Sequence, residues 1–289
     1  MSAKRFLLYS LSALFLISCS QQKEQAGISG FLSFNIEHTV NGLPLKVDEF
    51  AYTNEAGNQY MITEIQWFIS GISLIDDQGN RFNLPEEESV FYIDTDIESS
   101  LQINLNAKIP AGNYSGISFV FGLDEEQNKS LRFVNPPESF MFWPEYLGGG
   151  YHYMKLNGKW INEAGLPEPF NFHLGIGQEY EDGYAKSTKH HFGAATQYDH
   201  CEGYQPSHSL PAVVSFIDNS FNITLNDVVF TVANGKRTSL KLEMQVENWF
   251  QNPHVYDHNE WGGSIMQQQD AMRLGCENGN NVFVIKPVE

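Results

Sequence analysis

The sequence predicts an all-β protein, an antiparallel β-sandwich with long loops and one short C-terminal helix. Several short segments alternate apolar and polar residues, which is typical of strands with one buried face. Turn-forming clusters of Asn, Asp, Gly and Pro separate these segments. Many short strands with turns between them indicate a sandwich rather than a helical fold.

The strand candidates follow one another along the chain. Alternation marks residues 31–38, 101–105 and 170–174, and mostly apolar runs add 65–75, 90–94, 117–123, 151–156, 221–232 and 240–246. Turns such as Asn157-Gly158 separate them. Residues 265–274 are the one segment that suggests a helix, and Gly275 lies near its end. Residues 177–211 are polar, rich in His and Gly, and predicted to form a long loop.

The first residues are predicted to be a lipoprotein signal peptide, residues 1–18. Lys4 and Arg5 precede an apolar stretch that is too short to span a bilayer. The stretch ends in Leu-Ile-Ser-Cys, which resembles a lipobox and predicts lipidation of Cys19. The alternative is an ordinary secretory signal that is cut nearby. Residues 19–29 would then be a flexible tether and 30–289 one domain, in the cell envelope of a Gram-negative bacterium, periplasmic or outer-membrane facing.

Composition excludes several functions for this chain. Its 289 residues include 17 basic and 35 acidic side chains, a formal charge of −18, which disfavours a nucleic-acid partner because phosphate binding needs clustered Lys and Arg. The sequence lacks the G-x-S-x-G, P-loop and HExxH motifs, so we do not expect an enzyme. A paired-carboxylate hydrolase stays open, since such pairs are recognised only in space.

The cysteines allow two interpretations. Export would place Cys201 and Cys276 in an oxidising compartment, where two cysteines most simply form one disulfide. The alternative is that Cys201 provides a thiol ligand in a metal site of the His-rich loop.

Motifs spread over most of the mature chain resemble, in order, those of the MbnP-like family. They include Val40-Asn41-Gly42-Leu43-Pro44-Leu45, Ile109-Pro110-Ala111-Gly112-Asn113-Tyr114, Tyr151-His152-Tyr153-Met154 and Asn252-Pro253-His254. The founding member is the periplasmic copper-binding protein of methanobactin operons. The resemblance implies a copper-binding β-protein of the cell envelope, and the fold transfers more safely than the ligands.

The resemblance also implies a ligand set and a partner. In some relatives two histidines and a kynurenine hold copper. The kynurenine forms when a partner dihaem enzyme of the bacterial cytochrome c peroxidase type oxidises a tryptophan. Trp143 is the favoured candidate here and Trp67 the second. The competing interpretation is that each tryptophan simply packs in the core.

The histidine candidates for copper are His38 and His173, with His152 as a third ligand. His38 and His173 match family motif positions, and His173 alternates with Phe172 and Leu174, so it points away from these apolar neighbours. Each histidine could instead be a hydrogen-bonded structural residue or a plain surface residue. The secondary metal candidates are His200 and His208 in the loop, which could equally be solvated.

Two further groups have mainly structural interpretations. His254 and His258 flank Asp257 near the end of the chain. Asp94-Thr95-Asp96 offers oxygen ligands for calcium but lacks a complete calcium loop.

The sequence thus predicts a lipid-anchored envelope protein that binds copper by histidines for sequestration or handling. One alternative is a structural or partner-binding lipoprotein that has lost the metal site. Another is a surface module that recognises glycan or peptide through exposed aromatic residues.

Overall fold

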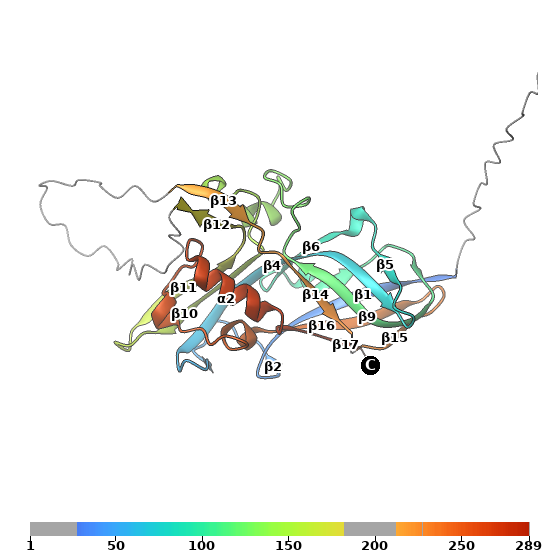
Figure 1. Cartoon of the computed structure of the whole chain (residues 1–289). Helices are drawn as coiled ribbons and strands as arrows, with labels where there is room; N and C mark the ends of the chain where they lie inside the picture. The colour runs from blue at the N-terminus through green and yellow to red at the C-terminus, as the bar shows by residue number, and fades with distance from the viewer. Residues whose placement is uncertain (1–27, 182–211, 227, 289) are drawn as a thin grey trace, which may run out of the picture.

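The computed structural model describes residues 28–181, 212–226 and 228–288 (Figure 1). Within these ranges the strands form a six-stranded, a nine-stranded and a two-stranded sheet. The six-stranded sheet contains β1 (Ser29–Val40), β2 (Leu43–Pro44), β7 (Gln102–Asn104), β8 (Ile109–Pro110), β16 (Arg237–Gln245) and β17 (Phe283–Pro287). The all-β prediction is confirmed.

The nine-stranded sheet is built around one long strand, β4 (Gln59–Asp76). Its other strands are β3 (Tyr52–Thr53), β5 (Arg81–Asn83), β6 (Val90–Asp94), β9 (Gly112–Phe121), β10 (Met154–Ile161), β11 (Pro167–Leu174), β14 (Phe221–Leu225) and β15 (Phe230–Val232). Strands β10 and β9 pair with successive parts of β4, and β3, β5 and β6 also pair with it.

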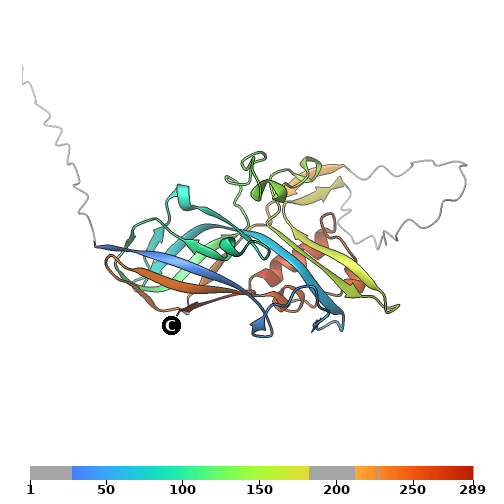
Figure 2. The same cartoon turned by 180° about the vertical axis from the view of Figure 1, so that it is seen from behind.

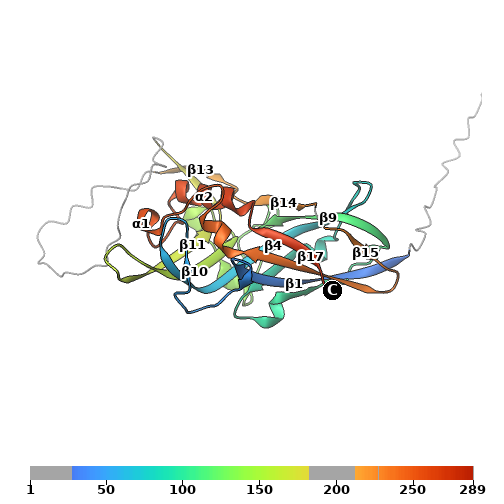
Figure 3. The same ribbon diagram turned by 90° about the horizontal axis from the view of Figure 1, so that it is seen from below.

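One pair of strands departs from the antiparallel pattern. β1 and β16 run side by side in the same direction (Figures 2 and 3). Phe31 stands opposite Arg237. Parallel neighbours need a long connection between them, and here that connection is nearly the whole domain.

The core lies between the two large sheets. Trp67 on β4 is fully buried and its ring contacts Phe121 of β9 and Phe283 of β17, so all three side chains come from the facing surfaces. Because side chains alternate along a strand, the residues next to Trp67 in β4 point to the opposite surface of the nine-stranded sheet. Part of that second surface is covered by the connection between β9 and β10, since Phe133 and Tyr151 pack on Phe68.

Several segments differ from the predicted elements, and the predicted turn Asn157-Gly158 lies inside β10. Residues 221–232 form two strands, β14 and β15, because the pairing with β9 is interrupted between Leu225, opposite Ile117, and Phe230, opposite Tyr114. The start of the predicted loop is a strand, β12 (Gly177–Tyr180), which pairs with β13 (Val213–Ile217).

The C-terminal helix is confirmed, but it begins later than predicted. α2 spans Gln269–Gly279 and packs against β11 (Figure 1). Ile265 is buried and its carbonyl accepts from the N–H of Gln268, so it belongs to a turn that precedes the helix. A short helix, α1 (His258–Trp261), also lies before it. None of the helices in the described ranges has the length and apolar character to span a membrane.

Short 3-10 turns connect several strands. They are η1 (Glu86–Glu88), η2 (Glu98–Leu101), η3 (Glu138–Met141), η4 (Glu145–Leu147) and η6 (Val246–Phe250). The predicted strand 101–105 therefore begins one residue later, since Leu101 closes η2.

Candidate metal centre

His152 and His173 lie together on the outer surface of the nine-stranded sheet. Their ring centres are 5.0 Å apart and the rings are nearly perpendicular, at 86°. A bond between a metal ion and an imidazole nitrogen is about 2 Å long, so two rings at this separation can hold one ion between them.

The pairing of β10 with β11 creates this proximity. His173 on β11 stands opposite Lys155 on β10, and the N–H of Tyr153 donates to the carbonyl of Leu174. His152 immediately precedes this paired region. The antiparallel pairing of β10 with β11 therefore brings together two residues that are 21 positions apart in sequence.

A hydrogen-bonded relay fixes the orientation of His173. The Asn157 side chain donates from Nδ2 to Oε2 of Glu64 at 3.0 Å, and its Oδ1 lies 2.8 Å from Nε2 of His173. Since Oδ1 can only accept, Nε2 of His173 carries the proton and Nδ1 carries the lone pair. That Nδ1 is buried and has no hydrogen-bond partner among the described residues.

A β-bulge next to Asn157 sets up the relay. The register between β10 and β4 shifts between Asn157 and Gly158. A Cβ at Gly158 would lie 2.2 Å from the carbonyl oxygen of Met61, so only glycine fits where the strands approach. Bulges commonly redirect a neighbouring side chain, and here the bulge follows the residue that contacts His173.

The backbone fixes the orientation of His152. Its Nδ1 lies 2.9 Å from the carbonyl oxygen of Met141, which can only accept. Nδ1 is therefore the protonated nitrogen and Nε2 carries the lone pair. Each of the two imidazoles thus has one nitrogen anchored by a hydrogen bond and carries its lone pair on the other nitrogen.

Burial keeps both imidazoles neutral. It lowers the pKa of His152 to about 3 and that of His173 well below its usual value, with the neighbouring His152 and Lys155 adding to the effect on His173. The neutral imidazole is the form that binds metal ions.

Trp143 borders the histidine pair. Its ring centre lies 4.6 Å from that of His152 in an edge-to-face arrangement. The indole is fully buried, and its Nε1 donates to the carbonyl of Leu147 at 3.0 Å. A Cβ at Gly175 would lie 2.7 Å from the indole ring, so this glycine makes room for Trp143 two residues after His173.

His38 does not join this group. It pairs instead with Trp67, whose Nε1 donates to Nε2 of His38 at 3.1 Å. Trp67 stands opposite Met154 on β10, one residue from Lys155, which faces His173. Trp67 and His173 therefore emerge from opposite faces of the sheet, and the structure does not unite His38 with His173 as the sequence predicted.

The overall architecture matches that of known proteins. The MbnP family model covers residues 29–267 of the chain. The chain belongs to the MbnP family. Among solved structures, MbnP from Methylosinus trichosporium matches with a TM-score of 0.50 and 13% sequence identity, over 90% of this chain and 99% of that one. At this identity the match shows a shared fold. The comparison with curated proteins gives no match.

Family membership confirms the resemblance that the motifs indicated, but the remaining candidates from the sequence are scattered. Cys19, Cys201, His200 and His208 lie outside the described residues. Cys276 is a free, half-buried thiol on α2, so the predicted disulfide with Cys201 is not seen. His254 pairs with Glu277.

His258 occupies an aromatic enclosure in this MbnP family member. Its imidazole is fully buried, and both ring nitrogens lack hydrogen-bond partners among the described residues. The nearest rings are those of Phe170 at 4.4 Å and Phe250 at 5.0 Å between centres. Its ring contacts are with aromatic side chains, which supports a structural role.

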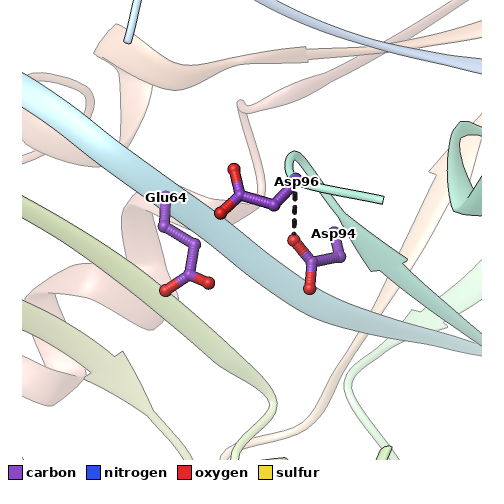
Figure 4. A group of neighbouring side chains, drawn as sticks. All are labelled: Glu64, Asp94 and Asp96. Carbon is purple, nitrogen blue, oxygen red and sulfur yellow. Dashed lines mark hydrogen bonds between the residues drawn. The ribbon is translucent and has the colours of Figure 1, made fainter. Parts of the chain in front are cut away.

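An acidic group lies beyond Asn157 on the same surface. Glu64, Asp94 and Asp96 place one carboxylate oxygen each within 4.8 Å of one another (Figure 4). The Asp94 oxygens already accept from the Tyr92 hydroxyl, the Gln66 amide and the Asp96 N–H. These bonds account for the buried carboxylate of Asp94 without a cation.

The groups that orient the two histidines are not evident from the sequence. The local pattern places Asn157 in a turn, and it gives no role to Glu64 or to the Met141 carbonyl. Strand alternation contained one usable signal, since Asn157 and Lys155 lie two residues apart and share a face. The register with His173 comes only from the three-dimensional structure.

Proposed function

We propose that this MbnP family member binds copper between His152 and His173 and serves to sequester or present the metal. The observation that carries the proposal is the buried Nδ1 of His173, which has no partner and lies beside a second imidazole. A buried nitrogen without a partner costs free energy, and a bound metal ion would recover it.

The chemistry of the donors supports copper. Imidazole is a favoured ligand of copper, and histidine ligands usually have their second nitrogen fixed by a carbonyl or carboxylate-linked group. Here Met141 and the Asn157–Glu64 pair supply that support. Both histidines are neutral, so no proton has to leave before an ion binds.

Trp143 is the residue that we propose as the oxidisable tryptophan, because it contacts His152 while Trp67 lies on the other face of the sheet. Conversion would need peroxide and a haem enzyme. The C2–C3 bond of the indole breaks, each carbon gains a peroxide oxygen as peroxide is reduced to water, and hydrolysis releases the formyl carbon as formate. The dihaem partner, the export signal and the lipid anchor at Cys19 stay predictions.

Copper titration tests the proposal directly. The chain without residues 1–18, with Cys19→Ser, is titrated anaerobically with Cu(I) against a chromogenic chelator, and separately with Cu(II). We expect stoichiometric binding that competes with the chelator. A chain that never removes copper from even a weak chelator would instead be a structural or partner-binding protein, as the competing prediction holds.

Asn157 provides a graded test of the site. Replacing Asn157 with leucine removes the acceptor for His173 Nε2–H, and we expect copper affinity to fall by about 10- to 100-fold. Asn157→Asp keeps an acceptor, so its copper affinity should fall less than that of Asn157→Leu. The ¹⁵N chemical shifts of the His173 ring in the metal-free protein report the tautomer separately, and unchanged shifts in Asn157→Leu would show that the relay does not set it.

A further inference from the structure

A groove of about 410 Å³ lies at one side of the sandwich, where the chain passes from β6 through η2 to β7. It is separate from the histidine pair. β6 is at an edge of the nine-stranded sheet and β7 at an edge of the six-stranded sheet, so the groove lies between two strands that each pair on one side.

The main chain of β6 faces this groove with unused hydrogen-bonding groups. The N–H of Gly71 donates to Ser89 and that of Thr95 to Ile65, so residues 89, 91, 93 and 95 form the bonded pairs with β4. Val90 and Tyr92 therefore turn their N–H and C=O groups away from β4. No bond to these N–H groups is recorded from the residues that the structure describes.

The Ser100 side chain already bonds to the main-chain groups of Asp94 at the end of the same edge. The Asp94 N–H donates to Oγ of Ser100, and this hydroxyl lies 3.0 Å from the Asp94 carbonyl oxygen. At this position Ser100 of η2 takes the place of a neighbouring strand. The open part of the edge is therefore Val90–Tyr92, which is also the part that lines the groove.

The opposite wall has a similar edge. The Leu105 N–H donates to the Leu32 carbonyl, and Ile103 is the next bonded residue of β7 toward its beginning. Gln102 and Asn104 consequently direct their main-chain groups away from β1. The side chains of Phe91 and Ile103, which pack against the core, supply apolar surface in the groove.

The open part of this edge contains no proline, lysine or bulge, which often protect exposed edges from pairing. It reads Val-Phe-Tyr and pairs with β4 in regular register. The one charged lining residue is Glu138, and the whole chain carries −18. The groove therefore suits a neutral or basic segment.

We propose that this groove binds an extended, neutral or basic peptide segment of a partner protein, which adds as a strand to the edge of β6 at Val90 and Tyr92. The main chain of the peptide bonds to this edge, and alternate side chains lie over Phe91 and Ile103. Strand addition of this kind gives affinity through main-chain bonds and specificity through alternate side chains.

A peptide selection tests the proposal. A phage-displayed library of short random peptides is selected on the mature chain and counter-selected on Ser99→Trp, which fills the groove from its exposed rim. We expect enriched peptides of neutral or positive charge. Tyr92→Pro, which lacks the N–H, should bind them about tenfold more weakly than Tyr92→Ala, which keeps it.

N-methylation of the selected peptides tests the pairing without any variant of the protein. Methylation of alternate peptide nitrogens should abolish binding and methylation of the intervening ones should not. The proposal is overturned if no peptide is enriched over Ser99→Trp, or if N-methylation shows no alternation. It is equally overturned if sedimentation shows a wild-type dimer that Ser99→Trp dissociates, since a second copy would then fill the groove.

Discussion

Replacing either His152 or His173 with alanine is expected to weaken copper binding by more than about 100-fold. Loss of a residue that only orients a metal ligand typically costs 10- to 100-fold, and loss of the ligand itself should cost more. Affinity would be measured by competition with a Cu(I) chelator for the wild type and both variants.

The controls follow from the positions of the other histidines. His38→Ala should keep its copper affinity, because His38 faces Trp67 on the opposite side of the sheet. It should lower the free energy of unfolding by about 1–3 kcal/mol, since the buried Trp67 N–H loses its acceptor. His200→Ala/His208→Ala should also keep tight binding. Copper binding that survives His152→Ala/His173→Ala but disappears in His38→Ala would contradict our assignment.

Acid is expected to destabilise the metal-free fold between pH 6.5 and about 3. Burial lowers the pKa of His38 to about 4 and that of His152 and His258 to about 3, from 6.5 in the unfolded chain. Below pH 6.5 the unfolded chain therefore binds protons that the folded chain does not, and stability falls as the pH falls. Each of these histidines is expected to lower the free energy of unfolding by about 2 kcal/mol at pH 5.

His258 gives the clearest single test of this effect, because it is fully buried and its ring nitrogens have no partners in the described structure. His258→Phe should reduce the loss of stability between pH 7 and pH 5 by about 2 kcal/mol, measured by urea unfolding at each pH. Tyr256→Phe is the matched control, since its ring packs on His258 and burial raises the pKa of its hydroxyl, far from this pH range. An equally steep pH dependence in His258→Phe would refute the explanation.

Much of the fold could be predicted from local pattern. Alternation identified the strand that contains His173, and the apolar run at 90–94 coincides with β6. Both patterns reflect burial of one strand face, which a sequence records directly. The start of α2 was missed because Ile265 is buried in a turn, and burial alone does not distinguish a turn from a helix.

The candidate site could be predicted only in part. The motif resemblance singled out His152, His173 and Trp143, which the structure brings together. It also suggested His38, which the structure places elsewhere, because the face on which a side chain emerges depends on register between strands distant in sequence. The role of Asn157 depends on a bulge at Gly158, which single-sequence patterns do not reveal.

The parallel pairing of β1 with β16 has a consequence for how the protein reaches its native state. β1 can pair with β16 only after Arg237, the partner of Phe31, has been synthesised. Forming this pair therefore closes a very long chain loop. Completion of synthesis and completion of the fold therefore nearly coincide. A chain truncated before Arg237 would leave the apolar strand Ser29–Val40 open to proteases and to aggregation.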